Sequence, residues 1–242
     1  MKIKNIVISL VMLSVLSAFS DPFNSEWDWE GAQNIRGKVK TITTPRKVEK
    51  FNERGQKTLS KSLGKDGAVK YETTLLYNNS GKLWKIIRKK AGEDTPIYTE
   101  IASYNSKGVM ESVKREGGMG HNGSTENIEY DANGHLDSIS IKTGSTLMTW
   151  RYNFSKEGIL QSSKMMTDET VKSEAICTSN TKGDQEKVEI SRNGKPSQLI
   201  EIDYQYDDHG NWIVMVKKIT VYREDKIIKP EPLTKTRTLE YY

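Results

Sequence analysis

The sequence predicts an all-β protein, a single long antiparallel meander of about 14 strands built from hairpin repeats. Three observations carry this prediction. Glycines recur about every 26 residues, a second turn signal stands about half a period later, and the residues between the turns alternate between apolar and polar. A sheet of so many strands twists and does not stay flat, so we expect it to curl into a trough, a partial barrel or a shell.

The composition fits a sheet with a thin core. Hydrophobic residues make up 35% of the 242 residues and charged residues 29%, and the mean hydropathy is −0.68. This is little apolar material for a thick core. The 11 Tyr and 5 Trp are nevertheless too many for a disordered chain.

Residues 1–20 are expected to form a secretory signal peptide. Lys2 and Lys4 give a basic start, an apolar stretch runs from Ile6 to Leu16, and Ala18-Phe19-Ser20 supplies small residues before a cut at Asp21. A retained membrane anchor is the alternative, but the apolar stretch is shorter than the roughly 20 residues of a spanning helix. We therefore expect a periplasmic or secreted protein without a transmembrane segment after cleavage.

Two regions follow the signal peptide. Residues 21–34, with Trp27 and Trp29, are expected to form an irregular N-terminal cap, and residues 35–242 a single repeat domain. We expect no helix in this domain, because no window outside the signal shows a helical apolar stripe.

The turn glycines define the repeat. Their successive spacings are 26, 27, 26, 24, 25 and 27 residues, and a Tyr or Phe stands four residues before the glycine in every copy except the one with Ser179. Glycine permits the backbone conformation of the turn, and the Asn or Asp that usually follows the aromatic residue is expected to bond to nearby backbone. The seven turn-defining glycines are Gly55, Gly81, Gly108, Gly134, Gly158, Gly183 and Gly210.

Each unit carries a second turn and two strands. Residues 200–206 show the strand pattern, with Ile or Tyr at even positions and acids or Gln at odd positions, so one face is expected to be buried. The second turns are expected at Gly67, Gly92, Gly117-Gly118, Thr143-Gly144, Thr167-Asp168, Asn193-Gly194 and Glu224-Asp225.

The C-terminal region is expected to be a loop followed by the last strand. The stretch KPEPLTK (residues 229–235) contains prolines that keep the loop from pairing, and the stretch TRTLEYY (residues 236–242) alternates as a strand does. An open meander has two edge strands, so an edge-strand homodimer is one oligomeric state that the pattern allows.

The charge and the cysteine content bear on two questions: whether the protein binds nucleic acid, and whether it contains a disulfide or a thiolate metal site. The formal charge is +5, and it falls to +3 without residues 1–20 (35 basic minus 32 acidic residues), with both signs interspersed, so we expect no nucleic-acid partner. Cys177 is the single cysteine, which excludes an intramolecular disulfide and a multi-thiolate metal site. We expect it to be a small buried residue rather than a reactive thiol.

No motif points to catalysis, a cofactor or a metal. His135 and His209 flank turn glycines and His121 lies in a glycine-rich stretch, without the spacing of a zinc motif. The stretches DANG (residues 131–134) and DDHG (residues 207–210) lack the alternating acids of a calcium loop and are explained by hairpins. We therefore expect no catalytic, cofactor-binding or metal-binding residues.

Aromatic residues are the candidate ligand contacts. On a curved sheet, exposed rings would bind sugars or extended peptides by stacking and apolar contact, and the alternative is that they form the core of a sheet poor in Leu and Phe. The candidates are Trp84, Trp150, Tyr152, Tyr204 and Trp212.

Several copies resemble a known repeat. The stretches YDANGHLDSISI, YNNSGKLWKI and YDDHGNWIVMV are similar to the YD repeat of RHS-type and teneurin-type proteins, whose consensus is close to Y-D-x-x-G-x-L followed by a strand. The resemblance covers roughly residues 45–222 and is weaker in the copies at Phe51, Phe154 and Ser179. It implies a strand-turn-strand unit and a secreted or envelope protein. The chain is too short for the toxin-enclosing shell of the large members.

Together these observations predict a secreted or periplasmic, non-enzymatic binding or structural repeat protein of the bacterial cell envelope. Its partner would be a protein, an envelope polysaccharide or a lipidic ligand. The alternative is an immunity or inhibitor protein paired with a toxin, for which interspersed charge could give specificity. A third hypothesis is an enzyme that uses Asp or Glu residues brought together by the fold, but the spacing of these residues in the sequence gives it no support.

Overall fold

The computed structural model describes residues 35–117, 125–132, 135–143, 145–223 and 226–242, and these ranges contain strands and turns but no helix. The expected signal peptide and N-terminal cap lie outside the described residues, as do Gly134 and the turn residues Gly118, Gly144, Glu224 and Asp225. In the part that is described, no helix has the length and apolar character needed to cross a membrane.

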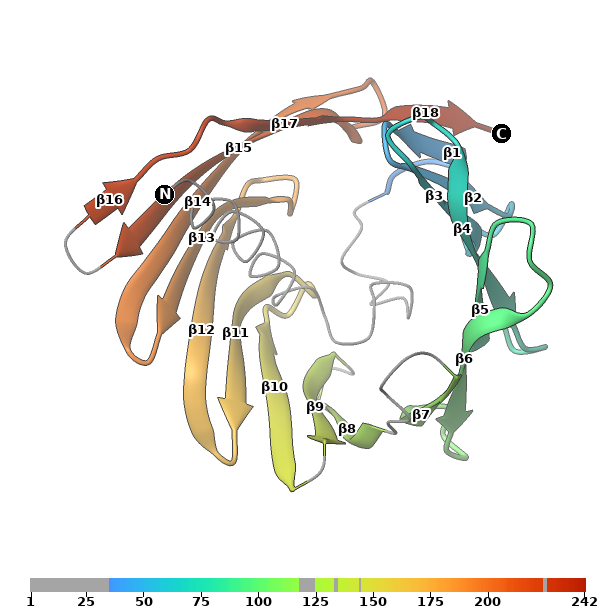
Figure 1. The fold of residues 1–242 in the computed structure, drawn as a ribbon, viewed down its shortest axis with the longest axis horizontal. Helices are drawn as coiled ribbons and strands as arrows, with labels where there is room; N and C mark the ends of the chain where they lie inside the picture. Colours follow the sequence, from blue (N-terminus) through green and yellow to red (C-terminus); the bar gives the residue numbers. More distant parts are fainter. Residues whose placement is uncertain (1–34, 118–124, 133–134, 144, 224–225) are drawn as a thin grey trace, which may run out of the picture. The chain divides into compact units, whose positions relative to one another are not determined.

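Eight strands form sheet A, coloured blue to green with red β18 at its end in Figure 1. Their order across the sheet is β18-β1-β2-β3-β4-β5-β6-β7, and all ladders are antiparallel. The strands are β1 (Val39–Thr44), β2 (Lys47–Phe51), β3 (Lys57–Leu63), β4 (Val69–Tyr77), β5 (Leu83–Lys90), β6 (Pro96–Tyr104), β7 (Met110–Gly117) and β18 (Thr238–Tyr241).

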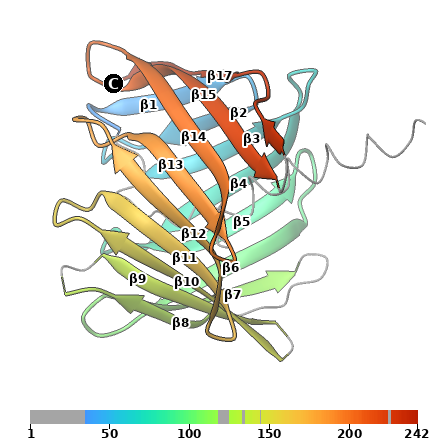
Figure 2. The same cartoon turned by 90° about the vertical axis from the view of Figure 1, so that its left-hand side faces the viewer.

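Ten strands form sheet B, and Figure 2 shows them side by side in chain order from β8 to β15. The path across the sheet runs from β16 to β8, and β17 also pairs with β15. The strands are β8 (Thr125–Tyr130), β9 (Leu136–Thr143), β10 (Thr146–Phe154), β11 (Leu160–Thr167), β12 (Thr170–Ser179), β13 (Gln185–Arg192), β14 (Lys195–Tyr206), β15 (Trp212–Arg223), β16 (Lys226–Ile228) and β17 (Leu233–Thr236).

The predicted all-β antiparallel meander is confirmed, because consecutive strands pair throughout β1–β7 and β8–β16. The meander is divided, however. Strands β7 and β8 lie next to one another but share no ladder, so the ladders of the described residues do not close into one ring. The described residues contain 18 strands rather than about 14, and two of the unexpected ones are the short strands β16 and β17. Strand β17 begins inside residues 229–235, so the expectation that this whole stretch is an unpaired loop is wrong.

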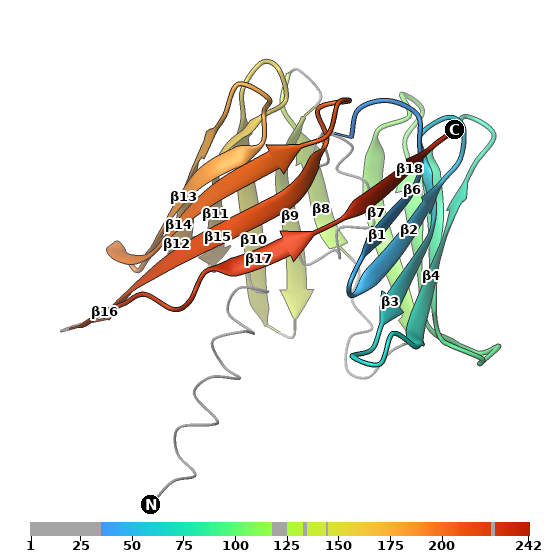
Figure 3. The same ribbon diagram turned by 90° about the horizontal axis from the view of Figure 1, so that it is seen from above.

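The C-terminal strands join the two sheets. Figure 3 shows β17 and β18 running in one line from sheet B to sheet A. Strand β17 pairs with β15, and β18 pairs with β1, with only Arg237 between them. The sequence stretch TRTLEYY is therefore divided between two strands, and one side of β18 is already paired within the chain.

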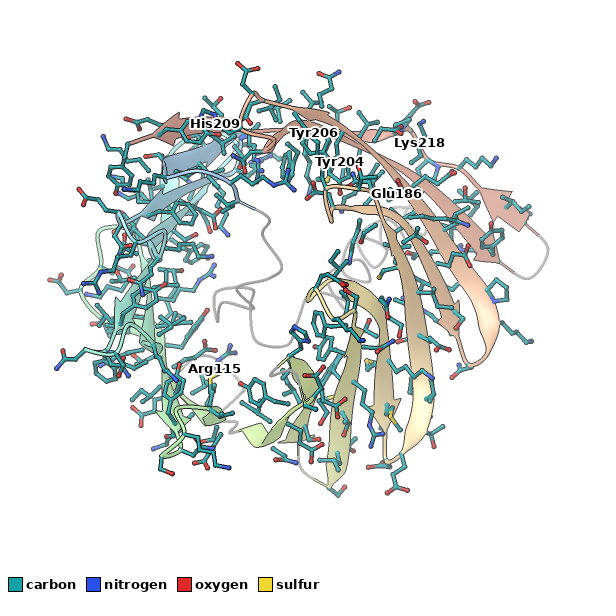
Figure 4. All side chains as sticks on the ribbon, turned by 180° about the vertical axis from the view of Figure 1, so that it is seen from behind. Arg115, Glu186, Tyr204, Tyr206, His209 and Lys218 are labelled. Atoms are coloured by element: carbon teal, nitrogen blue, oxygen red, sulfur yellow. The ribbon has the colours of Figure 1, made fainter. Side chains whose placement is uncertain are left out.

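Each sheet has a buried face, which we call the inner face, and an opposite outer face. The inner face carries Leu75 and Ile86 in sheet A and Ile139, Ala175 and Ile200 in sheet B, all at most 7% exposed. Figure 4 shows Tyr204 and Tyr206 on the inner side of β14 and Lys218 on the outer side of β15. The inner face also holds charge: Glu100 is 0% exposed and receives hydrogen bonds from Arg115 of β7.

The hairpin turns share one hydrogen-bond pattern, which Asn78 illustrates. Its backbone N–H donates to the carbonyl of Lys82 at 2.8 Å, and its Oδ1 accepts from the N–H groups of Ser80 (3.0 Å) and Lys82 (2.9 Å). A side-chain oxygen accepts from the fourth residue along in every copy. Gly81 has φ +78°, which favours glycine, and the five other described turn glycines have φ between +74° and +80°.

A β-bulge follows each of these turns. The residue three positions after each turn glycine has no partner in the ladder, since the register skips it. Bulges increase the local twist, so seven of them at a regular spacing bend the meander repeatedly in the same way. The bulge residues are Thr58, Trp84, Glu111, Asp137, Gln161, Glu186 and Ile213.

Tyrosine hydroxyls bond beside the bulges. Tyr77 donates to the carbonyl of Lys57 at 2.8 Å, and Tyr104 donates to the carbonyl of Leu83, in each case the residue just before the bulge of the preceding unit. The repeated Tyr thus connects successive hairpins, with its ring half-buried and its hydroxyl satisfied. In the copy that has Ser179 instead, Ser179 Oγ is the one buried side-chain oxygen or nitrogen without a hydrogen bond among the described residues.

Candidate functional site: an apolar groove on the outer face

The aromatic residues that the sequence suggests as ligand contacts do not lie in one place. Trp84 is the bulge residue of β5 and is 38% exposed. Trp150 and Tyr152 lie half-buried on the inner face of β10, opposite Met165 and Ser163 of β11. Tyr204 and Trp212 lie together further along sheet B, with ring centroids 6.4 Å apart.

The ring cluster of Tyr204, Tyr206 and Trp212 is held by cations and hydrogen bonds. The guanidinium of Arg237 lies 3.8 Å from the Trp212 ring centroid, and its Nε donates to the Trp212 carbonyl at 2.5 Å. Tyr204 donates to the carbonyl of Gln185 at 2.8 Å. Burial is the main cause of a raised pKa of Tyr204, so its hydroxyl stays neutral at ordinary pH.

The single cysteine and the two described histidines have structural surroundings. Burial raises the pKa of the Cys177 thiol to about 11, which disfavours the nucleophilic thiolate. The backbone N–H of His135 donates to Asp131 Oδ1 at 2.8 Å, and the His135 ring Nδ1 lies 3.3 Å from Asp131 Oδ2. His209 stacks on Tyr241 with ring centroids 4.0 Å apart. In the described ranges no group of three or more His, Cys, Asp or Glu could hold a metal ion, and His121 lies outside them.

A groove of about 450 Å³ crosses the outer face of sheet B over β12, β13, β14 and β15. Its apolar side chains include Ile176, which is 54% exposed, and Tyr222, which is 36% exposed. Next to the groove the β13–β14 register skips Ser197, which adds local twist. The lining residues are Glu174, Ile176, Glu189, Ile190, Ser191, Pro196, Gln198, Leu199 and Tyr222.

Charged side chains surround this apolar centre. Glu174 lies 3.1 Å from the ammonium of Lys164, and Glu189 forms an ion pair with Lys187. Their partners are about half exposed, so these ion pairs are weak and can rearrange when another surface approaches. An apolar centre with a charged rim is the usual arrangement of a protein-binding surface.

Sequence reasoning missed this groove, although a signal for it exists. In β12 the inner positions are Ser173, Ala175 and Cys177, so Ile176 stands at a position that the alternation assigns to the polar face. Leu199 and Tyr222 are exceptions of the same kind in β14 and β15. The sequence does not show that these three apolar residues lie next to one another on the outer face, because that depends on the register of the strands.

Comparisons with known proteins show the fold. No family model matches the sequence, and no curated protein matches it. The chain is similar to a porin-like protein from Bacteroides uniformis, with a TM-score of 0.57 and 10% identity over 86% of this chain and 98% of that one. This level of identity shows a shared fold and nothing more specific.

Two further solved structures are less similar. A porin-like protein from Bacteroides vulgatus has a TM-score of 0.39 and 12% identity over 85% of this chain and 99% of that one. The complex named TcdB2-TccC3-Cdc42 has a TM-score of 0.35 and 12% identity, over 79% of this chain but only 14% of that one. Neither score is high enough to support an argument about this chain.

Proposed function

We propose that the chain is a secreted or periplasmic, non-enzymatic binding protein, a small YD-repeat protein, and that the outer groove receives apolar side chains of a protein partner. The observation that carries this proposal is the convergence of Ile176, Leu199 and Tyr222 on the otherwise polar outer face. Exposing an isoleucine by half costs hydrophobic free energy in the isolated protein, which covering it with a partner would recover.

The groove chemistry favours a protein partner over a polysaccharide. Sugars are usually bound by flat aromatic surfaces with convergent hydrogen-bonding groups, whereas Ile176, Leu199 and Pro196 are aliphatic. The ion pairs of Glu174 and Glu189 at the rim supply charge patterns that a protein surface can match.

Selection of peptides by display on the immobilised mature protein tests the groove. Selected peptides are expected to be rich in apolar residues, and Ile176→Lys should weaken their binding at least tenfold in fluorescence polarisation. Val171→Lys is the matched control, because Val171 is also an exposed apolar residue of β12 (41%) but does not line the groove. Equal binding by both variants, or no selected peptide at all, contradicts the assignment of the groove.

The proposed export from the cytoplasm and the proposed lack of enzymatic activity need separate tests. Intact mass of the protein recovered from a bacterial host should show a chain that begins at Asp21 in the periplasm or the medium. Recovery of uncleaved protein in the membrane fraction would contradict the secretory address. Turnover of any substrate by the purified protein, abolished by one substitution, would contradict the non-enzymatic part of the proposal.

A further inference from the structure

Two lysines lie side by side on the inner face where β15 pairs with β17. Lys217 is opposite Leu233 in this ladder, and Lys235 is opposite Met215, two residues along each strand. Lys217 is also opposite Ile202 of β14, a buried residue of the inner face. Diagonal neighbours of this kind lie about 7–8 Å apart at their Cα atoms, within reach of one another's long side chains.

Neither ammonium has a carboxylate partner within the described ranges. The pKa of Lys217 is lowered, mainly by burial and then by the positive charge of Lys235, and no acid acts against this shift. Lys218, the next residue on β15, shows the contrast: it points to the outer face and lies 2.8 Å from Asp203. The acids nearest the ring cluster are occupied, since Asp184 and Asp207 accept hydrogen bonds from Tyr206 and Tyr241.

The surroundings of the two lysines are apolar. Ile202 and Met215 are 7% and 8% exposed, while Leu233 is 47% exposed, and among the described strands β17 pairs with β15 alone. Two positive charges held close together in such surroundings repel each other, and a bound anion would reverse this unfavourable interaction. Because Lys217 is half-buried, its bond to an anion would be screened less than a bond at the open surface.

We propose that Lys217 and Lys235 bind the phosphate or carboxylate group of an amphiphilic anion, whose apolar chain lies against Leu233. This site is on the opposite face of sheet B from the groove and does not depend on the proposed function of the groove. The anionic group would accept charge-assisted hydrogen bonds from both ammonium groups, and the chain would cover the exposed leucine.

Isothermal titration calorimetry with dodecyl phosphate, dodecanoate and inorganic phosphate tests the site. The two amphiphiles are used below their critical micelle concentrations. Dodecyl phosphate is expected to bind, and Lys217→Met and Lys235→Met should each weaken binding at least tenfold. Lys218→Met is the matched control and should bind as the unchanged protein does, because its side chain lies on the other face. Lys235 is exposed, so its variant is expected to stay folded even if Lys217→Met disturbs the sheet.

The three ligands distinguish the sources of the anion. Tighter binding of dodecyl phosphate than of dodecanoate supports the proposal with a phospholipid-like ligand, and the reverse order supports it with a fatty acid. Equally tight binding of inorganic phosphate would show that the apolar chain contributes nothing, and would overturn the assignment of an amphiphilic ligand. Binding that survives both lysine substitutions, that is lost equally in Lys218→Met, or that is absent for all three ligands overturns the proposal.

Discussion

At the scale of the residue, each turn depends on one side-chain oxygen, which comes from Asn, Asp or Ser in the different repeats. The oxygen of Asn78 satisfies two backbone N–H groups that the tight turn leaves without a carbonyl partner. Asn79, the next residue, is exposed, and its side chain has no such bonds. Two identical amides in adjacent positions therefore differ in what they do for the fold.

Replacing Asn78 by Ala should lower the free energy of unfolding by about 1 kcal/mol, because both N–H groups lose their acceptor. Asn78→Asp keeps the acceptor oxygen and should stay within about 0.5 kcal/mol of the unchanged protein. Asn79→Ala is the matched control, and urea unfolding measures all three variants. An equal loss for Asn78→Ala and Asn79→Ala would contradict the assigned role of the turn amide.

The residue scale is also where the sequence was most informative. The spacing of glycines and aromatic residues located the turns, because a hairpin turn is closed by residues four positions apart, such as Asn78 and Lys82. The regular bulges were not predicted, because the skipped residues range from Trp84 to Glu111 and share no side-chain type. A bulge is specified by the backbone of the turn before it rather than by its own side chain.

At the scale of the element, β17 and β18 depend on the residue between them. Arg237 lies between the two strands, and its guanidinium packs on Trp212 while its Nε and backbone N–H donate to the carbonyls of Trp212 and Ile213. Burial lowers the pKa of Arg237, although the charges of Asp184 and Asp207 act in the opposite direction. The side chain therefore fixes where the chain leaves sheet B and enters sheet A.

Arg237→Ala should lower the free energy of unfolding by about 2 kcal/mol, because it removes a charged hydrogen bond and a cation–π contact together. Arg237→Lys should recover only part of this loss, since lysine keeps the charge but lacks the Nε donor. Thr236→Ala, at an exposed neighbouring position, is the control. Hydrogen exchange should also become faster in β17 and β18 of Arg237→Ala, and unchanged exchange there would contradict the role of this residue.

Elements were predicted less completely than turns. The alternation in residues 200–206 correctly separates the faces of β14, whereas the division between β7 and β8 and the pairing of β18 with β1 were not foreseen. The pairing of β18 with β1 places Ile42 opposite Leu239, and these two residues are nearly the full length of the domain apart in the sequence. Local periodicity carries no signal for such a long-range contact. The candidate groove was missed for the same reason, because it depends on the register of four strands.

At the scale of the whole domain, residues from both ends of the repeat region meet at its last hairpin turn. Asn211 is 0% exposed, and its side chain bonds to the backbone of Arg36 at 2.7 Å and to the hydroxyl of Tyr241 at 2.8 Å. Asn211 follows the turn glycine Gly210 and donates to the Arg36 carbonyl, as Gln56 follows Gly55 and donates to the carbonyl of Gly81 in the next repeat. The start of sheet A therefore takes the place of a next repeat on the last turn of sheet B.

This junction should be sensitive to acid through Asp207. Burial would raise the pKa of Asp207, but hydrogen bonds from the Tyr241 hydroxyl and from the N–H groups of Asn211 and His209 outweigh burial and lower it. A carboxyl whose folded pKa is lower than its unfolded pKa contributes stability that is present above the unfolded value, about 3.8, and is lost as pH falls through the folded value. The two sheets should therefore become less firmly joined below about pH 4.

Asp207→Asn should reduce stability near pH 7 by about 1 kcal/mol, because the amide can replace only one of the two acceptor oxygens and faces Tyr241 with a donor. The difference from the unchanged protein should shrink as pH falls toward 3, since the wild-type carboxyl is then being protonated as well. Asp208→Asn is the matched control, because Asp208 is exposed at the adjacent turn position and should leave the pH profile unchanged. Urea unfolding from pH 7 to pH 3 measures these profiles. A constant difference between Asp207→Asn and the wild-type protein across this range would show that the junction gains nothing from the ionised carboxyl.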